Sequence, residues 1–252
     1  MPLERSRRAR TAPALDLPPP YRLVTLREVG DDFAHAGKIA ADEGAGTLVY
    51  VGRFDLAEFA VVLEPDEPLG MARRAFYAGM TALADALAAH APPEKPITFD
   101  WPDAIRIDGG LIGGGRLAWP DDVGESELPA WLVFGAMIRM VAMGEDEPGL
   151  RPLSSALEAE GFDELGSGRL VESFARHLMV ATDTWQERGF GQIARNFLAR
   201  LAPAGSGMRR DLAENGDLIL RRMTDAAPER SALAQALAQV PSWLDPTTRG
   251  PK

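Results

Sequence analysis

Five glycines lie within seven residues of strand-like sequence, and this run constrains the fold more than any other feature. They are Gly109, Gly110, Gly113, Gly114 and Gly115. Glycines in mid-strand lose side-chain packing and cost conformational entropy, so the backbone at residues 113–115 is expected to need the close approach of another group. That group is either a ligand lying against the strand or the protein itself, at a β-bulge or beneath a helix. The run is not a dinucleotide fingerprint, since no helix begins after it, and it lacks the lysine of a P-loop.

Rigid and charged residues flank this run. Arg116 follows it and could bind a carboxylate or phosphate, although an arginine on a strand is also commonly solvated. Pro102 precedes it and predicts a turn or a sheet edge, because proline has no N–H for a strand ladder. Asp103 could accept hydrogen bonds from a ligand or cap its own turn.

Hydrophobic periodicity predicts an α+β domain. Strands are expected at residues 21–29, 47–54, 58–65, 97–102, 104–120 and 131–141, and helices at 31–43, 69–93, 153–165, 167–202 and 231–240. Asp31 or Asp32 is the expected N-cap of the first helix. Strands come first and helices later, which favours a mixed or antiparallel sheet with helices packed on one face.

Three local patterns sharpen this prediction. Strands 47–54 and 58–65 are expected to pair as a hairpin. The stretch 131–141 is almost continuously apolar, which is typical of a buried central strand. Asn215-Gly216 suits a type I′ turn in a hairpin over residues 209–222. We divide the chain into a flexible arm (1–19), a main domain (20–203) and a small C-terminal domain (204–252).

Composition excludes several classes of function. The chain has no cysteine and three histidines, so disulfides and thiolate metal sites are excluded and no metal site is expected. The net charge of −10 argues against non-specific binding to nucleic acid or to an anionic membrane surface. No stretch approaches 18 apolar residues, so no membrane span is expected and a cytoplasmic location is the default.

The order of these pieces resembles the biotin/lipoate–protein ligase superfamily, in its biotin-ligase-like branch. Residues 41–53 resemble the approach to the family's adenylate-binding loop, and Trp101-Pro102-Asp103 is similar to part of its lysine-tryptophan-proline-asparagine-aspartate motif. Residues 107–119 resemble its glycine-containing hairpin. Residues 209–220 resemble a hairpin of its small C-terminal barrel. The resemblance covers residues 20–222, and the shared order is its most specific part.

The resemblance implies a fold like that of class II aminoacyl-tRNA synthetases and biotin ligases. It also implies an ATP-dependent, AMP-forming activation of biotin or a lipoyl-type acid, with ATP and Mg as cofactors and transfer to a lysine of an acceptor protein domain. By the same resemblance, the ligand-binding residues are Gly52, Arg53, Trp101, Pro102, Asp103, Gly113, Gly114, Gly115 and Arg116. Arg53 and Arg116 would hold phosphate or carboxylate, residues 113–115 would lie along the acyl chain, and Asp103 would orient the ligand.

The chain departs from the family pattern where catalysis needs positive charge. Asp100 stands at the position of the motif lysine, glycines replace the hairpin lysine, and only Gly52-Arg53 remain of an arginine-rich loop. Exchanging a cation for an anion reverses an interaction of roughly 4 kcal/mol for unit charges 4 Å apart at an effective dielectric near 20. No catalytic residue is therefore assigned. The alternative function is a non-catalytic binder of a small acyl ligand or of a partner protein on the ligase fold.

Overall fold

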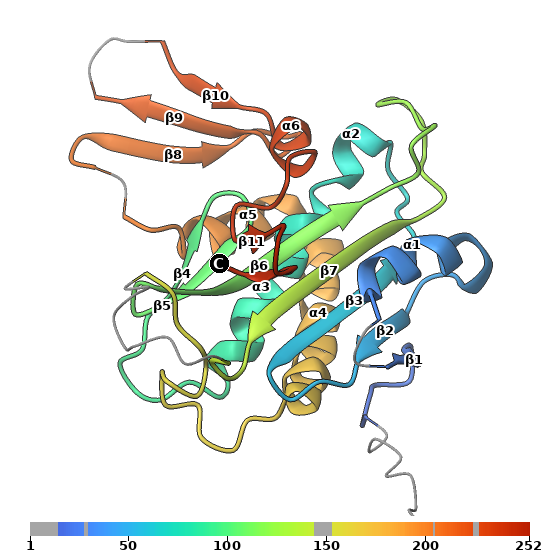
Figure 1. Ribbon diagram of the computed structural model, residues 1–252. Coiled ribbons are helices and arrows are strands. Elements are labelled where there is room, and N and C mark those ends of the chain that lie inside the picture. Colours follow the sequence, from blue (N-terminus) through green and yellow to red (C-terminus); the bar gives the residue numbers. More distant parts are fainter. Residues whose placement is uncertain (1–14, 28–29, 144–152, 204, 224–226) are drawn as a thin grey trace, which may run out of the picture.

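A seven-stranded mixed sheet forms the centre of the computed structural model, which describes residues 15–27, 30–143, 153–203, 205–223 and 227–252. The strand order is β1-β2-β3-β7-β6-β5-β4 (Figure 1). The strands are β1 (Arg22–Leu26), β2 (Thr47–Val51), β3 (Leu56–Leu63), β4 (Ile97–Asp100), β5 (Ala104–Ile107), β6 (Gly110–Ala118) and β7 (Leu132–Arg139). Strands β1 and β2 pair in parallel, and the other neighbours pair antiparallel. The predicted α+β class and mixed sheet are confirmed.

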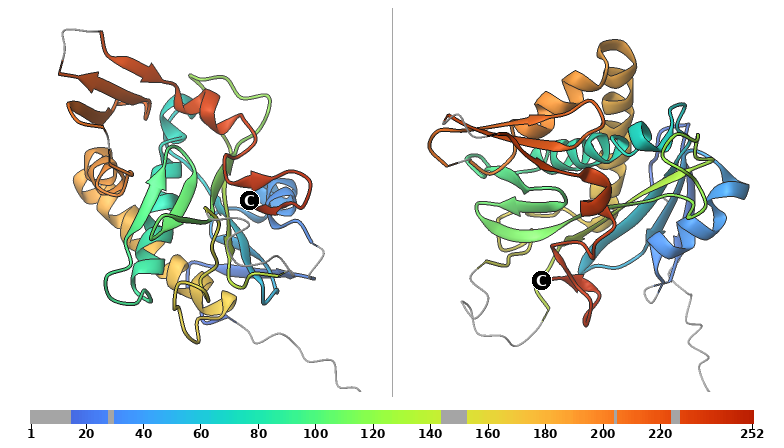
Figure 2. Two further views of the ribbon diagram at one scale, coloured as in Figure 1. Left: turned by 60° about the vertical axis from the view of Figure 1, so that its left-hand side comes forward. Right: turned by 90° about the horizontal axis from the view of Figure 1, so that it is seen from above.

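Helices cover both faces of this sheet. They are α1 (Asp32–Glu43), α2 (Leu69–Ala72), α3 (Ala75–Ala88), α4 (Ser167–Arg188), α5 (Phe190–Leu198) and α6 (Leu233–Leu237). Helices α3 and α4 pack with Phe59 and Phe134 in the main core. Helix α1 packs on the opposite face, against Val49 and Ala60 (Figure 2). The expectation of helices on one face therefore holds for α3 and α4 but not for α1.

Strand alternation explains why the central strands are apolar throughout. On β3, Phe59 and Val61 belong to the core beneath α3 and α4, whereas Ala60 and Val62 face α1. Strand β7 lies in the middle of the sheet and is buried from Leu132 to Ile138, as predicted. Strands β2 and β3 form the expected antiparallel pair.

Four predicted helices are wrong in extent or in type. The predicted helix 231–240 is reduced to α6, Leu233–Leu237. Residues 153–165 form turns, because the N–H groups of Leu157 and Glu158 bond to the carbonyls at the end of β7 rather than to a helix. The predicted helix 167–202 divides into α4 and α5 at Gly189, whose φ is +73°. The predicted helix 69–93 divides into α2 and α3.

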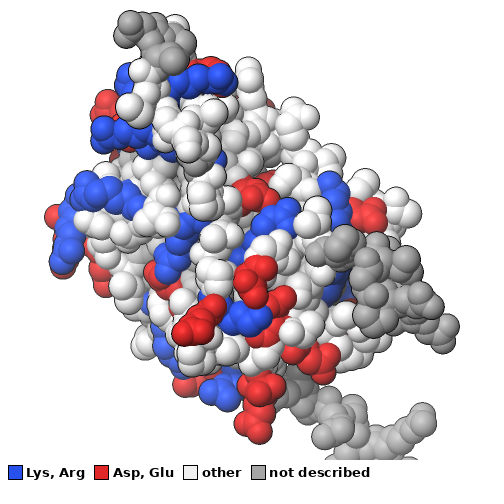
Figure 3. All heavy atoms as spheres, turned by 90° about the vertical axis from the view of Figure 1, so that its left-hand side faces the viewer, with Lys and Arg blue, Asp and Glu red and all other residues white. Residues whose placement is uncertain are grey.

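A second, three-stranded sheet follows α5 and consists of β8 (Met208–Leu212), β9 (Leu218–Arg222) and β10 (Glu229–Ser231). The predicted hairpin is confirmed, but its type I′ turn is wrong, because Gly216 has a positive φ of +88° and Asn215 does not. The basic side chains of its strands are all arginines, and they gather at this end of the molecule (Figure 3). The appended sheet thus differs in charge from the acidic chain as a whole.

The C-terminal residues return from this sheet to the main one. After α6, the short strands β11 (Leu244–Asp245) and β12 (Gly250–Pro251) pair with each other beside β6 and β7 (Figure 1). Of the predicted arm, residues 1–14 lie outside the described part. The backbone N–H of Asp16 donates to the Glu172 carboxylate of α4, and the Asp16 carboxylate accepts from Arg176. Among the described residues, no helix has the length and apolar character needed to cross a membrane.

Candidate functional site

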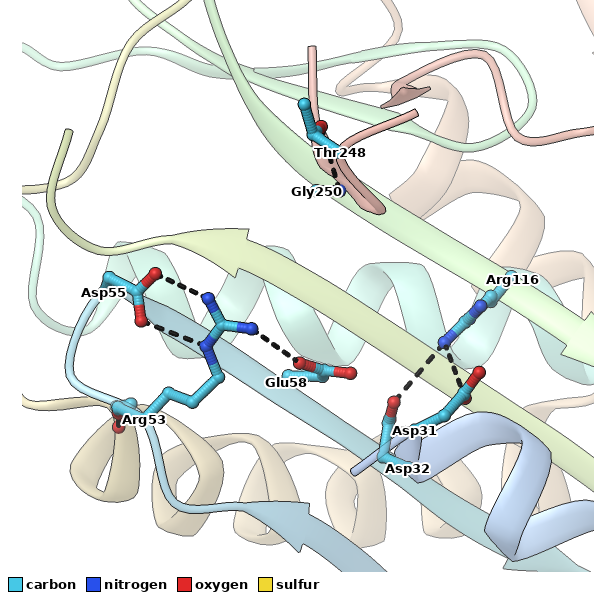
Figure 4. A network of polar contacts seen from close by, with 9 residues as sticks. Asp31, Asp32, Arg53, Asp55, Glu58, Arg116, Thr248 and Gly250 are labelled. Carbon is cyan, nitrogen blue, oxygen red and sulfur yellow. Dashed lines mark hydrogen bonds and ion pairs between the residues drawn. The ribbon is translucent and has the colours of Figure 1, made fainter. Parts of the chain in front are cut away.

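Two of the predicted site residues, Gly114 and Arg116, lie on the sheet face that α1 only partly covers. Gly114 and Glu58 both pair with Met137 of β7, so their positions share this face. Arg116 is two residues beyond Gly114 on β6 and points the same way. The topology thus brings β3, β6 and the start of α1 together around one surface (Figure 4).

The three mid-strand glycines are needed for three different reasons. Gly113 has a φ of +143°, and a Cβ there would lie 2.0 Å from the Met137 carbonyl oxygen. A Cβ on Gly115 would lie 2.7 Å from the Met80 sulfur, beneath α3. A Cβ on Gly114 would lie 1.9 Å from the Asp103 carbonyl oxygen and 2.4 Å from the Trp243 ring. The protein itself therefore approaches this backbone closely, and ligand contact along it stays a prediction.

Trp243 covers the surface at Gly114. Its side chain is fully buried and packs with Leu56, Ala104, Leu111 and Met137. The indole Nε1–H donates to the Gly115 carbonyl oxygen at 3.1 Å. We call the surface formed by Gly114, Leu56, Ala104, Leu111 and Met137 the Gly114 surface.

Asp103 lies beside this surface and is also engaged by the C-terminal residues. Its carboxylate accepts hydrogen bonds from the Ser242 backbone N–H at 3.0 Å and from the Ser242 hydroxyl at 2.5 Å. Burial raises the pKa of Asp103, and the bonds from Ser242 oppose that effect. Asp103 thus points toward the predicted site, where its present partner is Ser242.

Arg53 occupies the turn between β2 and β3. Its guanidinium bonds to both carboxylate oxygens of Asp55, at 3.0 and 2.6 Å, and lies 3.9 Å from Glu58. These hydrogen bonds from Arg53 hold the pKa of Asp55 below its usual range. Gly52, which precedes it, lies in the same turn, because β2 ends at Val51, before the predicted end of strand 47–54.

Arg116 joins β6 to the N-terminus of α1. Its guanidinium lies 3.3 Å from Asp32 and 3.8 Å from Asp31, and it stacks over the Phe33 ring at 4.1 Å (Figure 4). The Nε of Arg116 is buried without a hydrogen-bond partner in the described structure. Arg53 and Arg116 therefore approach the same face from opposite sides.

A pair of buried carboxyl groups lies between the two arginines. Asp32 and Glu58 are both buried, and the charge of each disfavours ionisation of the other. Burial raises the pKa of Asp32 to about 6, against the opposing charge of Arg116. Burial and the neighbouring Asp32 charge raise the pKa of Glu58 to about 8.

Comparison with known proteins identifies the family. Residues 17–199 match the model of the biotin/lipoate A/B protein ligase family. The chain belongs to this family. No curated protein sequence matches it.

Solved structures agree with this assignment. A biotin protein ligase-like protein of unknown function from Silicibacter sp. is 28% identical, with a TM-score of 0.77, over 90% of this chain and 100% of that one. A mutant of the biotin protein ligase from Aquifex aeolicus in complex with biotin is 14% identical, with a TM-score of 0.64, over 84% and 96%. The Leishmania major biotin protein ligase in complex with biotin is 16% identical, with a TM-score of 0.53, over 85% and 98%. The last two show a shared fold.

The residues around the family's tryptophan-proline motif serve the local structure of this member. Asp100, which the sequence resemblance places at the family's lysine, accepts a hydrogen bond from Arg106 at 2.6 Å. The Trp101 indole donates to the Tyr77 hydroxyl at 3.0 Å, away from the Gly114 surface. Pro102, the residue that follows Trp101, is buried. Of this motif, Asp103 carries the side chain that bonds to the residues covering that surface.

The described residues do not fit a triphosphate with its magnesium ion. A nucleotide needs unbalanced positive charge or backbone N–H groups around its phosphates. Arg53 and Arg116 already face four carboxyl groups, those of Asp31, Asp32, Asp55 and Glu58. Arg53 and Arg116 therefore offer little unbalanced positive charge to a triphosphate.

Four residues of this site were not predicted from the sequence as ligand-site residues, namely Asp32, Glu58, Ser242 and Trp243. The sequence does mark Glu58 as unusual, since it is the one charged residue within the apolar strand LAEFAVVL. It marks Trp243 too, as a large aromatic residue in an otherwise polar tail. Neither feature says which face of which strand the side chain meets.

Proposed function

We propose that this chain binds a small carboxylic acid at the Gly114 surface without activating it. The ligand would carry a ring with N–H donors at one end and its carboxylate at the other, as biotin does. The observation that supports this most is the chemistry of the groups around Gly114, which are hydrogen-bond acceptors at one end and an arginine donor at the other.

The acceptor end consists of the Gly115 carbonyl and the Asp103 carboxylate. Both are satisfied by donors: the Trp243 indole for Gly115, and the Ser242 N–H and hydroxyl for Asp103. A buried acceptor left without a donor costs about 1–3 kcal/mol. A ligand that replaces these residues should therefore bring donors of its own, which favours biotin over lipoate or octanoate.

The donor end is Arg116. It lies two residues from Gly114, or roughly 7 Å along the strand. Its buried Nε has no hydrogen-bond partner in the described structure. A ligand carboxylate that reaches this atom would add a charge-assisted hydrogen bond.

The charges at the site support binding without activation. Two arginines at the site are balanced by neighbouring carboxyl groups, and the sequence resemblance places Asp100 at the family's motif lysine. Phosphoryl chemistry depends on fixed positive charge around the developing anion. Binding of an acid needs one such donor, whereas adenylation needs several.

Titration calorimetry with biotin, lipoate and octanoate in the absence of ATP tests the proposal. Biotin should bind, and Arg116→Gln should raise its Kd by at least about tenfold, the equivalent of one charged hydrogen bond. Arg200→Gln is the matched control, since Arg200 pairs with Asp85 elsewhere and its loss should leave the Kd unchanged. Binding of none of the three acids, either to this chain or to a variant in which the residues covering the Gly114 surface are truncated, would exclude the proposal.

Family membership favours a second candidate, an ATP-dependent ligase for the same class of acid. It predicts release of pyrophosphate that depends on the added acid. Incubation with ATP, magnesium and each of the three acids separates the two functions. Heat from binding with no pyrophosphate supports the binder, and acid-dependent pyrophosphate supports the ligase.

A further inference from the structure

Residues 241–252, which we call the closing segment, cover the Gly114 surface. We infer that this segment is a built-in occupant of the ligand site, and that it must leave the sheet before a ligand can bind. The inference rests on the proposed function, because it concerns the regulation of the same surface.

The contacts of the closing segment reproduce those expected of the ligand. The flat indole of Trp243 lies against bare backbone at Gly114, where a Cβ would come within 2.4 Å of the ring. Its N–H donates to Gly115, and the two donors of Ser242 bond to Asp103. A ring with N–H donors at this place cannot coexist with Trp243, so occupancy by the ligand and by the segment exclude each other.

The segment is closed mainly on itself. Strands β11 and β12 pair, the Lys252 N–H bonds to the Trp243 carbonyl at 2.8 Å, and the Lys252 ammonium bonds to the Ser242 carbonyl at 2.6 Å. It can therefore move as a unit, since these bonds persist when it leaves the sheet.

The remaining attachment of the segment to the main domain is small. Besides Asp103 and Gly115, its polar anchors in the described part of the chain are two side chains. Arg139 bonds to the Pro251 and Lys252 carbonyls, and the Ser154 hydroxyl bonds to Lys252 at 2.7 Å. Within the segment only the side chains of Trp243 and Pro251 are buried. Elements with few buried side chains open at the lowest free energies.

Opening should limit the measured affinity. When the competent state is a minor population, the apparent Kd equals the intrinsic Kd divided by the fraction of open molecules. A substitution that weakens the closed state but leaves the Gly114 surface intact should therefore tighten ligand binding. A residue that only lines the site would behave in the opposite way.

Calorimetry with biotin on the full-length Trp243→Ala variant tests the inference. We expect its Kd to fall at least about tenfold relative to the unsubstituted chain, and that of Ser242→Ala to fall less. Val240→Ala is the matched control, because Val240 lies next to the segment with its side chain 64% exposed. An equal or higher Kd for Trp243→Ala would overturn the inference while leaving the proposed function intact, and binding to neither protein would overturn both.

A second measurement does not depend on the stability of a variant. The chain has five tryptophans, so labelling with 5-fluorotryptophan should give five fluorine signals, with Trp243 assigned by Trp243→Phe. Biotin should move the Trp243 signal to the position of a solvent-exposed indole, while Trp185 on α4 serves as the reference. A saturating titration that leaves the Trp243 signal unchanged would also overturn the inference.

Discussion

At the scale of single residues, the raised pKa of Glu58 couples the site to pH. Glu58 is inserted in an apolar strand, and its side chain is 7% exposed. Its pKa in the folded chain is about 8, above the 4.5 of an unperturbed glutamate. The folded state thus holds a proton that the unfolded state has released between these values. The stability that this proton contributes is complete below pH 4.5 and is lost as the pH rises to 8.

Glu58→Gln should remove this pH dependence, because the amide keeps the neutral form at every pH. Chemical denaturation between pH 5 and 8 should show the unfolding free energy of the unsubstituted chain falling relative to that of the variant. The limit is about 1.4 kcal/mol per pH unit for one proton. Glu187→Gln, an exposed substitution on α4, should track the unsubstituted chain. Parallel curves for Glu58→Gln and the unsubstituted chain would contradict the raised pKa of Glu58.

Local rules predict some residues well and others poorly. Asp31 was one of two expected N-caps of the first helix, and its side chain accepts a hydrogen bond from the Ala34 N–H at 2.9 Å. That bond joins neighbours in sequence, so propensity contains the information. The partners of Asp103 and Arg116 are 139 and 84 residues away, and no local pattern can identify them.

At the scale of elements, β6 is the strand on which the site depends. The sequence predicted the strand and left open whether a ligand or the protein required its glycines. The three positions meet different neighbours, because alternate residues of a strand face opposite sides of the sheet. The predicted helix 153–165 failed for a related reason, since the ends of β6 and β7 take up its backbone hydrogen bonds.

Gly114→Ala should destabilise the fold, because its Cβ would meet the backbone of Asp103 as well as the Trp243 ring. We expect a loss of about 1–3 kcal/mol in the free energy of unfolding, the usual cost of inserting atoms into a packed region. Gly166→Ala is the control: Gly166 has a φ of −79° and no atom within 4 Å of a Cβ. Equal stability of the two variants, measured by denaturant titration, would contradict the close contacts that the structure gives a Cβ at Gly114.

At the scale of the whole molecule, the closing segment connects the appended sheet to the main one. The chain leaves the main domain after α5, forms β8, β9 and β10, and returns with Ser242 and Trp243. The sequence predicted a small C-terminal domain over residues 204–252. It could not predict that residues 241–252 pack back onto the main sheet, because neither a two-residue strand nor a single tryptophan indicates which surface it will contact.

Hydrogen exchange followed by mass spectrometry should show this organisation directly. Without ligand, amides of residues 241–252 should exchange faster than those of β7, which bond to strands on both sides. Addition of biotin should slow exchange in β6 and speed it in residues 241–252. Protection of both regions by biotin would mean that the segment stays in place around the ligand.

The attachment of Trp243 to the same chain as its site also affects how a ligand search should be designed. A tethered competitor acts at an effective concentration on the order of millimolar, whatever the dilution of the protein. An acid with high intrinsic affinity would then register as a weak hit on the intact chain, and a conventional affinity threshold would discard it. Screening with the Trp243→Ala chain, and ranking acids by the ratio of their affinities for the two proteins, would recover the ligands that compete with the indole.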